Sequence, residues 1–225
     1  MHWNTVPFVQ SSDHEVFLAK GPAIWLRLIP QDATLREWSH DELLNHGRIQ
    51  GVPLLPLSWG NMQYLRAEDG IGAYATLDPL NQSQDTDSIA FAFNTGELWS
   101  IDTSVLQMAR EKKHLYFLDI ARTLVPKLRD YGQLLRSLGV PPPFKWQAGL
   151  EGIKGWRLNV PPPPNHISIF PGDSCLKDVV DAEGTYDPTQ PSAPALRPFF
   201  DQLFRKCSMS IPPHIDALIR NNGSL

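Results

Sequence analysis

The sequence lacks any long apolar run. Its richest apolar stretch, Ala23 to Ile29, is interrupted by Arg27 and followed by Pro30, whereas a membrane-spanning helix needs about 18 apolar residues in succession. Residues 1–15 lack the basic leader, apolar block and small-residue cleavage site of a secretory signal. We therefore expect a cytoplasmic protein without a membrane span.

Cysteine is equally scarce. Cys175 and Cys207 are the only two, too few and too far apart for a disulfide framework, and a thiolate zinc site needs more ligands nearby. We expect both to be buried, reduced thiols. The histidines are scattered without H-E-x-x-H or finger spacing, and the loop aspartates lack the glycine and glutamate of an EF-hand. We expect no metal and no other cofactor.

Signatures of nucleotide chemistry are missing or incomplete. No G-x-x-x-x-G-K-[ST] occurs, which excludes an ordinary phosphate loop. Gly70-Ile-Gly72-Ala-Tyr-Ala75 satisfies the loose dinucleotide pattern G-x-G-x-x-A, but that pattern requires a helix directly after the turn. Here the residues that follow indicate a strand, so we interpret the glycines as part of a hairpin.

Proline, by contrast, is abundant, with 21 residues, about twice the average usage. A hydrophobic fraction of 42% is ample for a core, so the prolines indicate element boundaries rather than disorder. Pro30 ends a strand predicted over 23–29, Pro141 to Pro143 follow a helix, and Pro161 to Pro164 form a spacer between strands.

Two hairpins are predicted over 62–102. Asp69-Gly70 separates the first pair of alternating runs, and Asn94-Thr95-Gly96 separates the second. Three or four further short strands are expected between the proline run at 141–143 and residue 181, because glycine and proline corners interrupt this region.

Three helices are predicted. The first covers 40–46, ended by Gly47, because Ser39 and Glu42 have the spacing of a capping box. The longest covers 106–138, where apolar residues recur every three to four positions and the cations mostly lie elsewhere; Pro126 predicts a break or a kink in it. The last covers about 195–207.

These elements predict an α+β fold. A mostly antiparallel sheet would carry one long kinked helix and a C-terminal helix. We expect one domain over residues 1–225, with a sub-division into 1–139 and 140–225 as the alternative.

Charge is unevenly distributed along the chain. The formal net charge of −4 is made up of −8 over residues 1–104, +6 over 105–157 and −2 over 158–225. A basic segment between acidic flanks favours internal pairing between layers over a nucleic-acid surface. The choice depends on whether 105–157 faces solvent.

Cations and aromatic residues alternate within that segment, in Phe144-Lys145-Trp146 and Lys154-Gly155-Trp156-Arg157. A single-stranded nucleic-acid site needs this combination, because cations contact phosphates while rings stack on bases. Strands whose tryptophans enter the core have the same composition, and this interpretation is favoured. The candidate nucleic-acid or partner-binding residues are Lys145, Trp146, Lys154, Trp156 and Arg157. No catalytic or metal-binding residue is predicted.

Gly172-Asp173-Ser174 follows an apolar run and resembles the nucleophile block of GDSL-type esterases. Such a serine needs a histidine base and an acid that orients it. No histidine in this chain has an aspartate three residues before it, so we expect a turn here instead.

Four strings, GPAIWLRLIP, FAFNTGELWSID, GVPPPFKWQAGLEGIKGW and LRPFF, resemble the accessory C-terminal region that follows the AlbA-type (Schlafen-like) domain of certain bacterial DNA-binding or ATP-binding proteins. The resemblance extends over most of the chain. In that family nucleic-acid binding is attributed to the AlbA-type domain itself, whose Asn-Thr-x-Gly-Gly turn is only partly echoed by Asn94-Thr95-Gly96, because Glu97 replaces the second glycine. The resemblance implies an accessory region alone and carries over no active-site residue.

The leading hypothesis is a non-catalytic binding or regulatory module of a bacterial cytoplasmic protein, associated with nucleic-acid-binding proteins. Its contact surface would be the basic segment 105–157, facing a nucleic acid or a protein partner. One alternative is a hydrolase with an active site near Ser174 and His166. Another is a protein-interaction domain that uses the proline ridge and exposed tryptophans.

Overall fold

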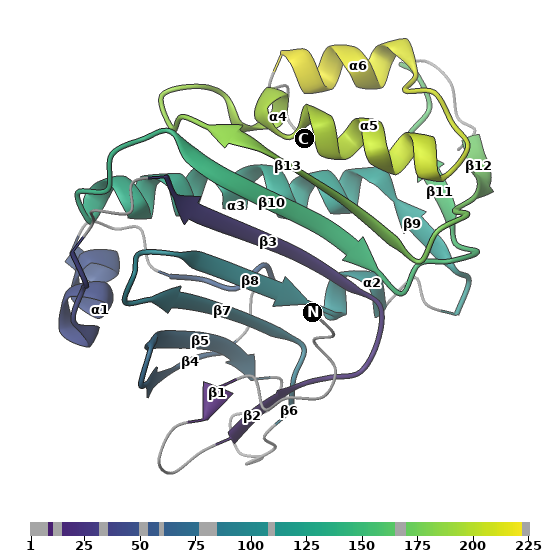
Figure 1. Ribbon diagram of the computed structural model, residues 1–225. Helices are drawn as coiled ribbons and strands as arrows, with labels where there is room; N and C mark the ends of the chain where they lie inside the picture. The colour runs from purple at the N-terminus through teal and green to yellow at the C-terminus, as the bar shows by residue number, and fades with distance from the viewer. Residues whose placement is uncertain are drawn as a thin grey trace.

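The protein is built on a seven-stranded sheet with strand order β13-β10-β3-β8-β7-β5-β4 (Figure 1). Every neighbouring pair in it is antiparallel. The fold was taken from a computed structural model, which describes residues 9–10, 15–31, 36–49, 54–58, 61–76, 85–107, 111–164 and 170–221. The expected α+β class, with a mostly antiparallel sheet, one long helix and helical structure near the C-terminus, is confirmed.

Three sheets and six helices are described. The large sheet consists of β3 (Ala23–Pro30), β4 (Asn61–Ala67), β5 (Gly70–Thr76), β7 (Ser88–Phe93), β8 (Leu98–Asp102), β10 (Phe144–Glu151) and β13 (Val179–Tyr186). The small sheets consist of β1 (Val9–Gln10), β2 (Glu15–Leu18) and β6 (Asp85–Thr86), and of β9 (His114–Tyr116), β11 (Arg157–Val160) and β12 (Phe170–Ser174). The helices are α1 (His40–Ile49), α2 (Ser104–Gln107), α3 (Phe117–Ser137), α4 (Ser192–Ala195), α5 (Arg197–Lys206) and α6 (Pro213–Arg220).

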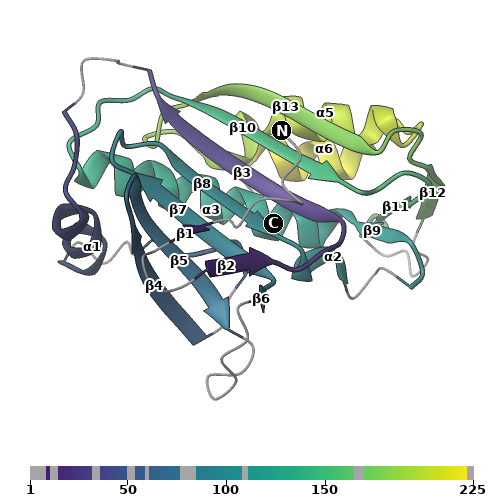
Figure 2. The same cartoon turned by 60° about the horizontal axis from the view of Figure 1, so that its bottom comes forward.

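Strand β3 shows how the sheet divides into two faces. Ile24, Leu26 and Leu28 are fully buried in the main core, whereas Trp25 and Arg27, at the alternate positions, point to the opposite side. Figures 1 and 2 show α3 running along the face that carries the main core. We refer to that side as the inner face and to the other as the outer face.

Two glycines make room for tryptophan rings beside β3. A Cβ atom on Gly149 of β10 would lie 2.4 Å from the ring of Trp25. A Cβ atom on Gly184 of β13, which is opposite Trp146 in the register, would lie 2.8 Å from that indole. Close approach of a ring to the backbone is therefore possible only without a side chain at these positions.

The long helix is shorter than predicted. It begins at Phe117 rather than near residue 106, because His114 to Tyr116 form strand β9, which pairs in parallel with β11. Leu115 is fully buried in this strand, and it also fits the apolar stripe of the predicted helix. The apolar spacing therefore could not distinguish helix from strand here. The helix continues through Pro126 without a break. Because proline has no backbone N–H, the carbonyl of Arg122, four residues before Pro126, has no helical hydrogen-bond donor. Arg122 is an exposed residue.

The predicted capping box is confirmed at α1. The backbone N–H of Ser39 donates to the Glu42 carboxylate at 2.9 Å, and the backbone N–H of Glu42 donates to the Ser39 hydroxyl at 3.3 Å. Gly47 does not end the helix, which extends to Ile49. Both hairpins are also confirmed, and Gly96 has a φ of +82° in the second turn.

The chain after residue 140 contains the expected strands, which belong to two different sheets. Strands β10 and β13 join the large sheet, while β11 and β12 pair with each other. Gly172 to Ser174 belong to strand β12, so the expected turn at this position is wrong. The predicted C-terminal helix is confirmed as α5, with Pro198 in its first turn, and α6 follows it.

The prediction of two reduced thiols is wrong. Cys175 and Cys207 are both buried, as expected, but they form a disulfide. They lie 32 residues apart in sequence. The fold brings them together because the loop between β12 and β13 contacts the end of α5, where the backbone N–H of Leu176 donates to the carbonyl of Lys206 at 2.9 Å.

Within the described residues, no helix has the length and apolar character needed to span a membrane.

The glycine at position 184 offers a test of the packing between β13 and β10. Gly184→Ala should lower the free energy of unfolding by about 1–3 kcal/mol, because the fully buried Trp146 ring must move to admit a methyl group. Gly21→Ala is the matched control, since a Cβ atom there has no neighbour within 4 Å. Denaturant unfolding of both variants measures the difference, and equal stabilities would contradict this packing.

Candidate functional site

The structure separates the five candidate binding residues. Trp146 is fully buried and Trp156 is 4% exposed. For these two rings the core interpretation is therefore confirmed, and neither presents a face on which a base could stack. Lys145, Lys154 and Arg157 reach the surface, but at two different places.

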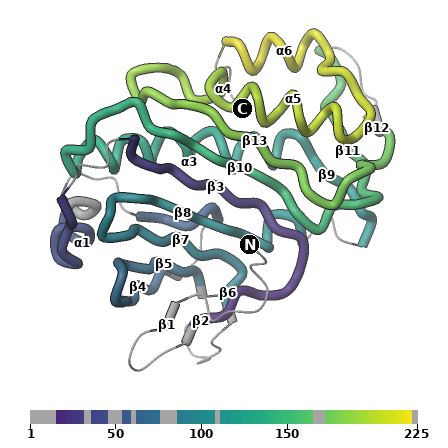
Figure 3. The backbone as a smooth tube through the Cα atoms, in the orientation of Figure 1, coloured from purple at the N-terminus to yellow at the C-terminus, as the bar shows by residue number. Residues whose placement is uncertain are grey.

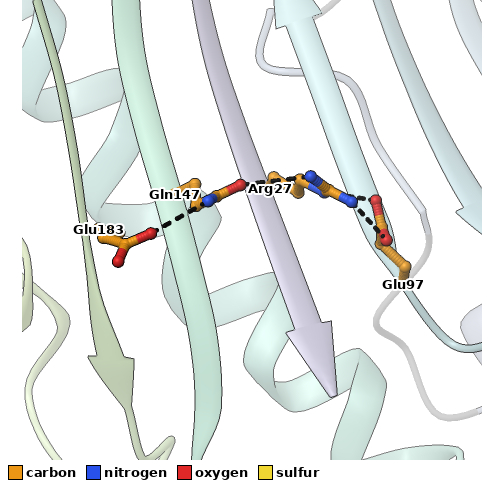
Figure 4. Close-up of polar contacts among 4 residues, drawn as sticks. All are labelled: Arg27, Glu97, Gln147 and Glu183. Carbon is orange, nitrogen blue, oxygen red and sulfur yellow. Dashed lines mark hydrogen bonds and ion pairs between the residues drawn. The ribbon is translucent and has the colours of Figure 1, made fainter. Parts of the chain in front are cut away.

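A row of polar side chains crosses the outer face, formed by Glu183 of β13, Gln147 of β10, Arg27 of β3 and Glu97 in the turn before β8 (Figure 4). Lys145 of β10 joins this row through Glu183. Arg27 donates to Glu97 through Nε at 2.5 Å and through Nη2 at 2.9 Å, and its Nη1 donates to Gln147 at 3.3 Å. Gln147 in turn donates to Glu183 at 3.1 Å, and the Lys145 ammonium pairs with Glu183 at 2.9 Å. Chiefly because of the hydrogen bond from Lys145, the pKa of Glu183 is lowered. Lys145 is thus already paired with a carboxylate.

Lys154 and Arg157 belong to a cationic surface at the end of the molecule where β9, β11 and β12 lie. We name it the basic edge and define it by Lys112, Lys113, Lys154, Arg157 and Lys177. All five side chains are exposed. Figures 1 and 3 show these strands at one end of the large sheet, beside the start of β13.

Backbone pairing holds the segments of the basic edge together. In the parallel ladder of β9 and β11, Arg157 lies opposite His114, and its N–H donates to the carbonyl of Lys113 at 2.8 Å. The turn before β11 contacts the loop after β12, where the N–H of Gly155 donates to the carbonyl of Cys175 at 2.9 Å. Cations from three separate stretches of the chain are therefore neighbours.

The cations of the basic edge have no ion-pair partner in the described part of the chain. Three exposed carboxylates, Glu111, Asp173 and Asp178, lie in the same segments, and Asp178 accepts a hydrogen bond from the backbone N–H of Lys154 at 3.3 Å. With five cations against three carboxylates, the edge remains positively charged.

No salt bridge joins segment 105–157 to the acidic first part of the chain among the described residues, although the buried Lys127 interacts electrostatically with Asp102. The segment forms two salt bridges there, Arg129 with Asp130 and Lys145 with Glu183. Neither partner lies in residues 1–104. The exposed cations of this segment therefore face solvent.

The large hydrophobic side chains that are exposed within the described residues also lie at the basic edge. They are Tyr116 at 37%, Leu176 at 65% and Val179 at 43%. Tyr116 ends β9, where it lies opposite Asn159 of β11, and its ring contacts that of His114 edge-on at 6.2 Å between centroids. Tyr116 was missed from the sequence because it lies within the segment 106–138, which was assigned to a helix.

A second polar group of residues is buried on the inner face. Lys127 of α3 is 5% exposed and Asp102 of β8 is fully buried, so this lysine is an exception to the expectation that the cations of the long helix mostly lie away from its apolar stripe. Burial lowers the pKa of Lys127, opposed by the carboxylates of Asp130 and Asp102. The residue occupies a core-facing position three residues after Leu124, a spacing from which its burial could have been predicted.

The same region attaches the segment 54–58 to the sheet. Tyr131 donates from its phenol to the carbonyl of Leu55 at 2.7 Å, and burial raises the pKa of this phenol. The backbone N–H of Ser58 donates to the Ser88 hydroxyl at 3.3 Å. Asp102 accepts hydrogen bonds from Ser104 and from the N–H of Val105 at the start of α2, while its second oxygen has no hydrogen-bond partner among the described residues.

The hydrolase alternative finds little support in the described residues. Ser174 lies in strand β12, opposite Arg157 of β11, rather than on the strand-to-helix turn that exposes a nucleophilic serine. No histidine hydrogen-bonds to it in the part of the chain described, and His166 lies outside that part. The described residues also contain no cluster of three His, Cys, Asp or Glu side chains suited to a metal ion.

No family model matches this chain. Comparison with curated proteins and with solved structures also finds no match. The resemblance to the accessory region of AlbA-type proteins therefore stays a prediction.

The buried lysine gives a pH-dependent prediction. Because the pKa of Lys127 is lower in the folded state, folding carries a penalty while the amine is protonated in both states. The free energy of unfolding should therefore rise, relative to that of Lys127→Met, as the pH increases from 7 toward the ordinary lysine pKa of about 10.4. Lys154→Met, at an exposed lysine, is the control. Parallel pH profiles of the wild type and Lys127→Met in denaturant unfolding would contradict the assignment.

Proposed function

We propose that this chain is a non-catalytic binding module that binds single-stranded nucleic acid at the basic edge. The observation that carries the proposal is the exposed ring of Tyr116 in the ladder of β9 and β11, two positions along from Arg157, which forms no salt bridge with any described residue. Such sites combine charges that contact phosphates with rings on which bases stack. The aromatic role assigned from the sequence to Trp146 and Trp156 thus passes to Tyr116.

The ion pairing of the cations favours the basic edge over the outer face of the sheet as the site that binds nucleic acid. On the outer face, Arg27 and Lys145 are each bound to a carboxylate, so an incoming phosphate would compete with an existing partner. At the basic edge the cations form no salt bridge with the described residues, and the release of their counterions on binding would drive association with nucleic acid.

The setting we propose is the bacterial cytoplasm, in association with DNA-binding proteins of the kind that the resemblance implies. A protein-interaction role through exposed tryptophans is less well supported, because none of the tryptophans whose side chains are described is exposed. A protein partner at the basic edge would have to be acidic, and it would not depend on the ring of Tyr116 for stacking.

The electrostatic part of the proposal is tested by removing one cation. Arg157→Gln should weaken binding to a fluorescent single-stranded oligonucleotide regardless of its sequence, and should reduce the slope of log affinity against log salt by about 1. Arg66→Gln, at an exposed arginine of β4 paired with Asp41, is the control with the same change in charge. Fluorescence anisotropy across a salt series measures both slopes. If the two variants lose equal affinity, the charge effect is general and the basic edge is not the site.

The stacking part is tested at Tyr116. Tyr116→Ala should cost about 1–3 kcal/mol of binding free energy and leave the salt slope unchanged, because no charge is removed. Tyr116→Phe keeps the ring and should bind almost like the wild type. The same anisotropy titrations check this, and an alanine variant with wild-type affinity would exclude base stacking at this residue.

A further inference from the structure

The disulfide lies directly behind the basic edge. Cys175 precedes Leu176 and Lys177 in the loop between β12 and β13, and Cys207 follows the last residue of α5. Both residues are buried. The bond therefore joins one of the segments that form the surface to the end of a core helix.

Cys175 is also tied to the turn that carries two of the cations. Its N–H donates to the carbonyl of Trp156 at 2.7 Å, and its own carbonyl accepts from the N–H of Gly155 at 2.9 Å. These two partners lie between Lys154 and Arg157. Arg157 is in turn paired with the strand that ends at Tyr116. A change in the position of Cys175 is thus transmitted to the surface through backbone hydrogen bonds.

The loop itself has few other attachments. Leu176, Lys177 and Asp178 are all exposed, and β13 begins at the next residue, Val179. The N–H of Leu176 donates to Lys206 at 2.9 Å and the carbonyl of Asp178 accepts from Ile153 at 3.2 Å. Without the covalent bond, the loop would be held by these hydrogen bonds, by the one that the Asp178 carboxylate accepts from the N–H of Lys154 at 3.3 Å, and by the contacts of Cys175, and ordering such a loop on binding costs affinity.

We propose that the Cys175–Cys207 pair is a redox switch that regulates binding at the basic edge. The oxidised form holds the loop in the arrangement that binds, and the reduced form binds more weakly. This inference rests on the proposed function. In a reducing compartment a disulfide is typically transient and redox-sensing rather than permanent.

The chemistry is thiol–disulfide exchange. In reduction, one thiolate of a dithiol attacks a sulfur of the Cys175–Cys207 bond, forms a mixed disulfide and releases the other cysteine as a thiolate. The second thiol of the dithiol then displaces the remaining cysteine, so two electrons pass to the protein and the dithiol becomes a disulfide. Oxidation is the reverse, with oxidised glutathione as the class of oxidant. Because both cysteines are buried, exchange requires local opening of the loop.

The test compares one protein in two redox states. Binding of a fluorescent single-stranded oligonucleotide is measured for the wild type as the disulfide, after dithiothreitol, and after reoxidation with oxidised glutathione. We expect affinity about tenfold weaker on reduction, within the usual range of coupling between two sites, and its recovery on reoxidation. Cys175→Ala combined with Cys207→Ala should bind like the reduced form and be insensitive to dithiothreitol.

The outcomes separate this inference from the proposed function. Absence of binding in both states would refute the proposed function, whereas equal affinity in both states would refute the switch alone. Far-UV circular dichroism on the same samples reports folding. Global unfolding on reduction would also overturn the switch, since the disulfide would then be a general structural bond. Amide hydrogen exchange should show increased exchange confined to residues 152–157 and 175–179 in the reduced protein.

Discussion

The alternation of β3 and β10 is the constraint on which the rest of the structure depends. These two central strands place large apolar side chains on the inner face, including Leu26 and Trp146, and place Arg27 and Gln147 beside Trp25 on the outer face. Helix α3 covers the inner face, and the rings of Phe117 and Phe200 extend the same core to α5 at 5.4 Å between centroids. Because one core includes residues of the sheet and of the helices, the ends of these elements have fixed positions relative to one another. The basic edge is formed by segments that leave this core.

The parallel pairing of β9 with β11 places part of the basic segment 105–157 on the surface. Both strands contribute buried residues, Leu115 and Leu158, to the core, so they leave Tyr116 and Arg157 outside it. This short ladder thus contributes both to the core and to the exposed surface. A basic segment that looked suited to internal pairing instead divides into a paired lysine on the outer face, a buried lysine on α3, and exposed cations on α3 and at the edge.

Features that depend on residues close in sequence were predicted more accurately than features that depend on distant residues. The capping box of Ser39 and Glu42 and the hairpin turns depend on residues close in sequence, and these predictions were confirmed. The start of the long helix was wrong, because β9 is a strand only through its distant partner β11. Of the candidate binding residues, Lys154 and Arg157 are exposed, while both tryptophans are in the core, as the favoured interpretation of the sequence expected.

The fold class, the hairpins and the excess of cations in residues 105–157 could be predicted from the sequence, since they depend on periodicity, turn chemistry and composition. The contact of Cys175 with Cys207, and the placement of Tyr116 and Arg157 in one strand ladder, became apparent in the folded structure. The physical reason is that strand pairing and disulfide formation depend on distances in space. Residues far apart in the chain become neighbours only after the core has placed the elements that carry them.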